Sequence, residues 1–305
     1  MGRVFSYEEI AASKIPTQQD FEAGRRDIID TINSCSDVLG AIMCGSIIHG
    51  TSNVRSDIDV AFFYHETPAV TAAMKGLRER SLERNLDLSL IPIEAEMAGT
   101  NFHAITTSFR QHLSMMAAQG GLIKADFTEW IKPWQSERDD LTAYLSHKWR
   151  YFNKRLNKID FMDPSDPKRL ETIQKALELG PHVARKMLSL WDVEVESDSK
   201  VEVIKAYSEL APVELSEQIN RLAEIDRWYT NELFLQMEKL DQERYLQVLD
   251  QLAAVVPAGY QFLRGSIMML HENYGISTDV SEVDLQADAA GLLNRLADAN
   301  LPFAA

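Results

Sequence analysis

Hydrophobic and polar residues in the first third of the chain follow patterns typical of β-strands. Apolar residues run almost without interruption from Val38 to Met43, which predicts a buried strand. A second strand is predicted over residues 57–63 and a third over residues 85–91, where polar and apolar side chains alternate. The segment from Pro68 to Arg84 is long enough for a crossover helix, so the last two strands should form a right-handed, parallel βαβ unit.

Apolar residues at helical spacing surround these strands. They predict two helices before the sheet, over residues 7–13 and 18–34, and one after it, over residues 102–119. The pair Gly120-Gly121 is expected to end the last of these helices, because glycine readily adopts the left-handed conformation found at helix ends. The tract Trp130–Trp134, rich in Trp and Pro, marks a domain boundary.

The sequence after residue 136 has a helical pattern throughout. Ser136 and the segment Asp163–Pro167 carry helix-capping residues, and Gly180-Pro181 is expected to end one helix. We therefore predict an α+β protein, with a small mixed-sheet domain over residues 1–133 and an all-helical bundle over residues 134–305. The helices expected in the second domain span residues 136–158, 167–180, 182–191, 200–210, 212–240, 242–256, 260–274 and 284–299.

The second predicted strand carries two carboxylates, Asp57 and Asp59, whose spacing places them on the same face. Burying two like charges close together is costly unless cations neutralise them. Carboxylate oxygens on a rigid strand suit Mg²⁺, which commonly takes one or two carboxylates plus substrate phosphates. The turn Gly45-Ser46 offers backbone N–H groups and a hydroxyl to such phosphates. Ten residues separate it from Asp57, which is long enough for one short helix.

The arrangement Gly45-Ser46, a gap of ten residues and Asp57-Ile58-Asp59 resembles the signature of the DNA polymerase β-like nucleotidyltransferase superfamily. The resemblance covers residues 38–93, under a fifth of the chain. It implies a small catalytic sheet followed by a helical bundle, and a third carboxylate on a later strand, for which Asp87 is the candidate. Two residues just past that strand compete for this role, Glu94 and Glu96.

The resemblance implies the transfer of a nucleoside monophosphate from an NTP or dNTP, ATP among them, to a hydroxyl group. Asp57 and Asp59 would bridge two Mg²⁺ ions, for which Mn²⁺ could substitute. Asp87 would ligate the second metal or accept the proton of the attacking hydroxyl. The residues expected to hold the phosphates in this domain are Gly45, Ser46 and Ser56.

One tract in the helical part combines basic and aromatic residues, His147-Lys148-Trp149-Arg150-Tyr151-Phe152-Asn153-Lys154-Arg155. It could present cations to a triphosphate and an aromatic face to a base. It could equally be an amphipathic helix whose aromatic residues pack in the core while its charges are solvated, and both interpretations can hold together. The candidates for nucleotide binding in this domain are Lys148, Tyr151 and Arg185.

The composition is that of an ordinary globular protein, with 45% hydrophobic and 25% charged residues over 305 positions. No apolar run approaches the ~20 residues needed to span a bilayer, and residues 1–9 lack an apolar signal core, so a cytoplasmic location without a membrane partner is expected. Cys35 and Cys44 make no disulfide framework, which fits a reducing compartment. The histidines show no ligand spacing, so no structural zinc is predicted.

A formal net charge of −15 argues against a long duplex or folded nucleic acid as a partner, since such ligands are usually held on a basic surface. An acidic protein suits a cationic acceptor of the aminoglycoside type, whereas the basic and aromatic tract suits a nucleotide or short oligonucleotide. The second is favoured, as in superfamily members that make nucleotide signals for bacterial antiviral defence. A protein adenylyltransferase and an inactive nucleotide-binding module remain alternatives. The base, the sugar, the acceptor and the oligomeric state, a homo-oligomer included, stay open.

Overall fold

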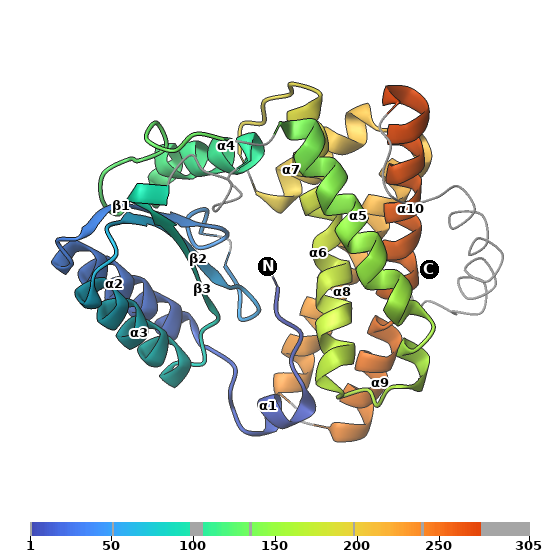
Figure 1. Ribbon diagram of the computed structural model, residues 1–305. Helices are drawn as coiled ribbons and strands as arrows, with labels where there is room; N and C mark the ends of the chain where they lie inside the picture. The colour runs from blue at the N-terminus through green and yellow to red at the C-terminus, as the bar shows by residue number, and fades with distance from the viewer. Residues whose placement is uncertain are drawn as a thin grey trace. The chain divides into compact units, whose positions relative to one another are not determined.

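The computed structural model describes residues 2–50, 52–97, 106–133, 136–197, 199–238 and 241–275. The chain divides into two compact units, one built on a sheet and one built of helices (Figure 1). The sheet unit comprises residues 1–3, 14–137 and 196–199, and the helical unit comprises residues 4–13, 138–195 and 200–305. These units differ from the expected contiguous domains, 1–133 and 134–305, chiefly because residues 4–13 belong with the helices.

Within the described part of the chain, three strands form a sheet in the order β1-β2-β3. β1 (Val38–Cys44) pairs antiparallel with β2 (Ile58–Tyr64), and β2 pairs parallel with β3 (Leu88–Glu94). Helix α3 (Pro68–Glu83) makes the crossover between the two parallel strands. The predicted small mixed sheet with its crossover helix is therefore confirmed, and the fold class is α+β.

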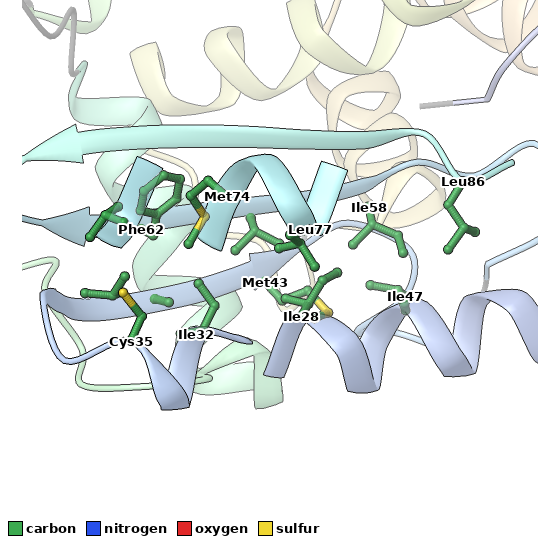
Figure 2. Packing of buried hydrophobic residues seen from close by; sticks show 14 of the residues in the cluster. Ile28, Ile32, Cys35, Met43, Ile47, Ile58, Phe62, Met74, Leu77 and Leu86 are labelled. Carbon is green, nitrogen blue, oxygen red and sulfur yellow. The ribbon is translucent and has the colours of Figure 1, made fainter. Parts of the chain in front are cut away.

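One face of the sheet is covered by α2 (Gln18–Ser34) and α3, as Figure 1 shows. The even-numbered residues of β2 point to this face, where Ile58, Val60 and Phe62 are almost fully buried. Burying each of these side chains stabilises the fold by ~1.5–3 kcal/mol. Because a shift of one residue would move them to the other face, the cluster also fixes the register of the strand. Figure 2 shows the helix residues that complete the cluster, among them Ile28 and Ile32 of α2 and Met74 and Leu77 of α3.

The odd-numbered residues of β2 point to the opposite face, which is covered in part by α4 (Thr107–Met116). Along β2 this face changes from apolar at Phe63 and Ala61 to acidic at Asp59. The ring of Phe63 stacks on that of Phe127, with centroids 5.7 Å apart, and so fixes the apolar end. The other buried residues packed there include Ile42, Ile93, Leu113 and Met116.

Two adjacent glycines turn the chain from α4 back to the sheet. Gly120 has φ = +96°, a conformation that glycine adopts at little cost. Gly121 lies so close to β1 that a Cβ atom there would be 2.2 Å from the carbonyl oxygen of Met43. Just beyond it, the amide N–H of Ile123 donates to the carbonyl oxygen of Ala41 (2.9 Å), which covers the outer edge of β1. The helix end predicted at this glycine pair is confirmed.

The described helices of the helical unit follow the predicted order with two differences in their bounds. None of the described helices is long and apolar enough to cross a membrane. The helices are α1 (Tyr7–Ala11), α5 (Glu137–Leu156), α6 (Pro167–Leu190), α7 (Lys200–Leu210), α8 (Val213–Glu238), α9 (Gln242–Leu252) and α10 (Val255–Tyr274).

The first difference is that α6 runs unbroken through Gly180-Pro181, so the helix end predicted there is wrong. Both residues are buried, and an added Cβ on Gly180 would lie 3.1 Å from Ile219 of α8. Tertiary packing therefore outweighs the hydrogen bond that a proline removes.

The second difference is that α10 begins at Val255, inside the range predicted for the preceding helix. The helix expected over residues 284–299 and the start of the one expected over 102–119 lie outside the described residues.

Residues 4–13 belong to the helical unit because two buried tyrosines bind their backbone. The hydroxyl of Tyr229 on α8 accepts from the amide N–H of Phe5 (3.2 Å), and the hydroxyl of Tyr245 on α9 donates to the carbonyl oxygen of Phe5 (2.9 Å). The two tyrosine oxygens lie 2.8 Å apart. The main-chain groups of a fully buried residue are thereby satisfied, which anchors the segment in the core.

Substituting Gly121 by Ala should destabilise the protein by ~1–3 kcal/mol or more, because the new Cβ would overlap a main-chain oxygen of β1. Gly76→Ala in α3 is the matched control. Its Cβ would meet one atom, the flexible end of Arg80 at 3.4 Å, and the change should gain ~0.5–1 kcal/mol of helix propensity. Chemical denaturation measures both free energies of unfolding. A Gly121→Ala variant as stable as the wild type would contradict the close approach to Met43.

Candidate functional site

The acidic residues of the candidate site lie at the start of β2. Asp59 is within the strand and is paired with Ser89 of the parallel strand β3. Asp57 precedes the strand by one residue, and pairing begins at Ile58, whose amide N–H donates to the carbonyl oxygen of Asp87 (2.9 Å). Residues paired across neighbouring strands point to the same face, so Asp59 and Ser89 share the face that α4 partly covers, and Asp57 lies close enough for its charge to act on Asp59.

Asp59 has the most perturbed carboxyl group of the site. Its pKa is raised from 3.8 to about 6, first by burial and second by the negative charge of Asp57. A hydrogen bond with Ser89 and the charge of His112, on α4, act in the opposite direction. A divalent cation between the two carboxylates would relieve both the burial cost and the repulsion.

The carboxylates of Asp57 and Asp59 suit a hard cation that takes only some of its ligands from the protein. In the described residues, no group of three or more His, Cys, Asp and Glu side chains is arranged to hold a metal ion. Zinc sites are normally built from three or four such ligands, whereas Mg²⁺ commonly uses one or two carboxylates together with water and phosphate oxygens. Two carboxylates are thus compatible with the Mg²⁺ expected from the sequence, which stays a prediction.

The three candidates for a third carboxylate lie at the two ends of β3. Asp87 directly precedes the strand, at the end that lies beside Asp57, and its side chain is exposed. Glu94 ends the strand, and Glu96 follows it, with Oε1 2.5 Å from Nδ1 of His65. At ~3.3 Å per residue, the length of the strand puts Glu94 roughly 20 Å from Asp87. Asp87 is thus the candidate at the correct end of β3.

The loop between β1 and β2 brings together the three residues expected to hold phosphates in the sheet unit. Gly45 has φ = +90° and makes the turn that leads out of β1. Ser46 Oγ donates to Ser56 Oγ (3.0 Å), which also accepts from the amide N–H of Asn53 (3.0 Å). Because Ser56 directly precedes Asp57, the hydroxyl pair lies next in the chain to the acidic residues.

The prediction of a short helix between Ser46 and Asp57 is wrong, because the described residues 46–50 and 52–57 contain only turns and irregular chain. Serine and asparagine side chains bond to nearby main-chain groups and so compete with helical hydrogen bonds. Asn53 Oδ1, for example, accepts from the amide N–H of Arg55 (2.9 Å). The loop therefore offers a phosphate the N–H groups of a turn and not those of a helix N-terminus.

The basic and aromatic tract of α5 is divided between different faces of the helix. Trp149 is 3% exposed and stacks on Tyr260 of α10, with ring centroids 4.6 Å apart, so it belongs to the core and cannot stack on a base. His147, Arg150 and Lys154 are exposed. The two interpretations of the tract thus apply to different residues, and for Trp149 the interpretation as a core residue holds.

Lys148, Tyr151 and Arg155 form a further face of α5, where they meet side chains of α6. Nζ of Lys148 lies 5.3 Å from the ring centroid of Tyr144. The ring of Tyr151 has Cζ of Arg155 at 3.8 Å and Nζ of Lys175, on α6, at 4.6 Å. These are cation–π distances, so a base could stack on Tyr151 only by displacing one of the cations.

Positive charge exceeds negative charge in this α5–α6 cluster. Burial lowers the pKa of Lys148, and among the described side chains no carboxylate forms an ion pair with it. The pKa of His182 is well below its usual value because of burial and then because of the surrounding cations, Arg185 first, so the ring is neutral. Five cations face three carboxylates: Lys148, Arg155, Lys175, Arg185 and Lys186 against Asp140, Glu171 and Glu178.

Comparison of the chain with protein-family models, with curated proteins and with solved structures gives no match. The resemblance to the nucleotidyltransferase superfamily therefore rests on the spacing of residues 45–59 and stays a prediction. Sequence reasoning missed Ser89 and His112 as partners of Asp59. The alternation that selects Asp87 also places Ser89 on its face, but no local signal in the sequence brings α4 to this end of β2.

The raised pKa of Asp59 predicts a pH-dependent stability in the absence of metal. Because the folded pKa is about 6 and the ordinary value is 3.8, the folded protein binds more protons between these values, and its stability falls as the pH rises through this window. Asp59→Asn removes this loss and should stabilise the protein by ~1–3 kcal/mol at pH 7 but by little at pH 4.

Thermal unfolding with a chelator at both pH values measures this difference. Asp30→Asn, which changes an exposed carboxylate of α2, is the control and should show no such dependence on pH. An Asp59→Asn variant that is less stable than the wild type at pH 7 would contradict the strained carboxylate pair.

Proposed function

We propose that the protein is a Mg²⁺-dependent nucleotidyltransferase that moves a nucleoside monophosphate from an NTP or dNTP to a hydroxyl group. The observation that carries the proposal is the close pair of Asp57 and Asp59 at the start of β2, directly after a loop that groups Gly45, Ser46 and Ser56. Carboxylates suit a divalent cation, and a turn that carries serine hydroxyls and main-chain N–H groups suits the phosphates that accompany it.

In the proposed reaction, Asp57 and Asp59 would hold two Mg²⁺ ions, for which Mn²⁺ could substitute. Such ions, when bound, would neutralise the pyrophosphate leaving group and lower the pKa of the attacking hydroxyl. The hydroxyl oxygen forms a bond to the α-phosphorus while the bond from that phosphorus to the oxygen bridging to the β-phosphate breaks. Asp87 accepts the hydroxyl proton. The turn Gly45-Ser46 and Ser56 orient the phosphates for in-line attack.

The α5–α6 cluster is proposed to bind the anionic part of a nucleotide. Its excess of cations supports this role, and so does the half-buried ammonium of Lys148, which no described carboxylate pairs. Lys148 and Arg185 would contact phosphate oxygens. Tyr151 would contact a base once Arg155 or Lys175 moved from its ring to a phosphate.

The acceptor that we favour is a nucleotide or a short oligonucleotide, as in the synthesis of a signal for antiviral defence. A protein of net charge −15 repels anions at long range, so an anionic acceptor needs a local excess of cations such as the α5–α6 cluster. An aminoglycoside-type antibiotic or a protein hydroxyl is the alternative acceptor. A module that binds nucleotides without turnover is the second alternative.

Incubation with each labelled NTP and dNTP plus Mg²⁺, with no added acceptor, should release pyrophosphate and form a new nucleotide species. Asp57→Asn and Asp59→Asn should each lower turnover at least ~100-fold, because both side chains would hold the metal. Circular dichroism should stay unchanged, and the control Asp30→Asn should keep full turnover.

Turnover above about a hundredth of wild type in either folded variant would contradict the metal assignment. NTP consumption that begins only when an aminoglycoside-type polyol is added would move the assignment to a small-molecule acceptor. Nucleotide binding without turnover in any of these reactions would favour the inactive module.

Replacing Lys148 and Arg185 together by Ala should weaken nucleotide binding at least ~10-fold and flatten its salt dependence, because each lost phosphate contact reduces counterion release. The matched control is Arg150→Ala with Lys154→Ala, which removes two cations from exposed positions of α5. Calorimetric titration at about 50 and 200 mM salt measures both pairs. Equal losses in the two double variants would assign the effect to overall charge and not to the cluster.

A further inference from the structure

Arg55, two residues before Asp57, is among the largest side chains that are fully buried, with 1% of its surface exposed. Its guanidinium stays charged at any ordinary pH. A buried charge costs several kcal/mol unless hydrogen bonds compensate it. The partners of Arg55 therefore decide how firmly this part of the loop is held.

The main chain of residues 2 and 3 binds Arg55 on two sides. Nε of Arg55 donates to the carbonyl oxygen of Arg3 (2.9 Å), and Nη2 donates to that of Gly2 (3.2 Å). In return, the amide N–H of Arg3 donates to the carbonyl oxygen of Arg55 (2.7 Å). We call these three hydrogen bonds the Arg55 clamp. An added Cβ on Gly2 would lie 2.9 Å from Nη2, so a side chain there would have to displace the guanidinium.

The two aspartates are held by different means. Asp59 lies inside β2, where strand pairing on both sides fixes its main chain. Asp57 lies before the first paired residue, Ile58, so the ladder does not reach it. The chain just ahead of Asp57 is held instead by the Arg55 clamp and by the bond between Ser56 and Ser46.

We propose that Arg55, through its clamp with Gly2 and Arg3, is a positioning residue that holds Asp57 beside Asp59 for cation binding. The inference rests on the proposed function, because it takes the pair to be a divalent-cation site. A guanidinium cannot itself be a metal ligand, so its effect passes through the main chain. Loss of the clamp should displace Asp57 and leave Asp59 in its strand.

A positioning role and a purely structural role differ in what they do to the folded protein. If Arg55 only stabilised the fold, its loss would lower the melting temperature and leave the metal affinity of the folded molecules unchanged. If it positions a ligand, the folded molecules should bind the metal more weakly. Residues that orient metal ligands typically contribute ~10–100-fold in affinity.

The experiment uses Mn²⁺ alone as the probe, titrated calorimetrically into the full chain well below the melting temperature of every variant. Arg55→Gln removes the charged donors, and Gly2→Val keeps them but pushes the guanidinium away. Each should raise the Kd for Mn²⁺ about 10-fold or more. Because both changes break one clamp, the double variant should bind no more weakly than the weaker single variant. Arg84→Gln, which removes the ion pair with Asp27 (3.1 Å), is the control and should leave the Kd unchanged.

A second measurement needs no metal. In Arg55→Gln the amide of Ile58, at the open end of the ladder, should exchange its hydrogen faster, while that of Val60 in the middle of β2 should keep the wild-type rate. The comparison within one strand separates local loosening near Asp57 from a general loss of stability.

The outcomes distinguish the inference from the proposed function. Unchanged Mn²⁺ affinity in Arg55→Gln, with a wild type that binds Mn²⁺, overturns the inference and leaves the function standing. Additive losses in the double variant overturn the clamp. A wild type that does not bind Mn²⁺ overturns the proposed metal site and the inference with it. If Arg55→Gln does not fold, Gly2→Val, which retains the guanidinium, gives the same comparison.

Discussion

The structure of the sheet unit depends on holding two negative charges together at one end of a buried strand. Burial of Asp59 and its repulsion by Asp57 both disfavour this arrangement, and the raised pKa of Asp59 reflects burial first and the repulsion second. The packing of Ile58, Val60 and Phe62 against α2 and α3 opposes this, because a slip by one residue would exchange the apolar and acidic faces. The apolar face thus stabilises the geometry of the acidic one, and Ser89 and His112 offset only part of the remaining cost.

Features with a local signal in the sequence could be predicted. Alternation and apolar runs located the three strands and the crossover helix, since the period of two is set by strand geometry alone. The parallel connection then placed Asp87 at the same end of the sheet as Asp57. Gly120-Gly121 could be assigned as a helix end because the conformation of Gly120 excludes most other residues.

Features that depend on contacts between distant residues could not be predicted. Gly180-Pro181 reads as a helix end, but burial of α6 against its neighbours keeps the helix continuous. The loop before Asp57 is long enough for a helix, yet its side chains bond to its own main chain. Residues 4–13 precede the sheet in sequence and belong to the helical unit, because the partners of Phe5 are contributed by Tyr229 and Tyr245, more than 200 residues away.

The distribution of charge gives the last constraint on what the protein can bind. The net charge is −15, yet the sheet unit crowds two carboxylates and the helical unit gathers an excess of cations around Lys148. Each arrangement is costly without a ligand, since like charges are held close in partly buried surroundings. The first is relieved by a divalent cation and the second by an anion. Within the sheet unit, a divalent cation would therefore be favoured over an anion beside Asp57 and Asp59, and within the helical unit an anion would be favoured over a cation beside Lys148.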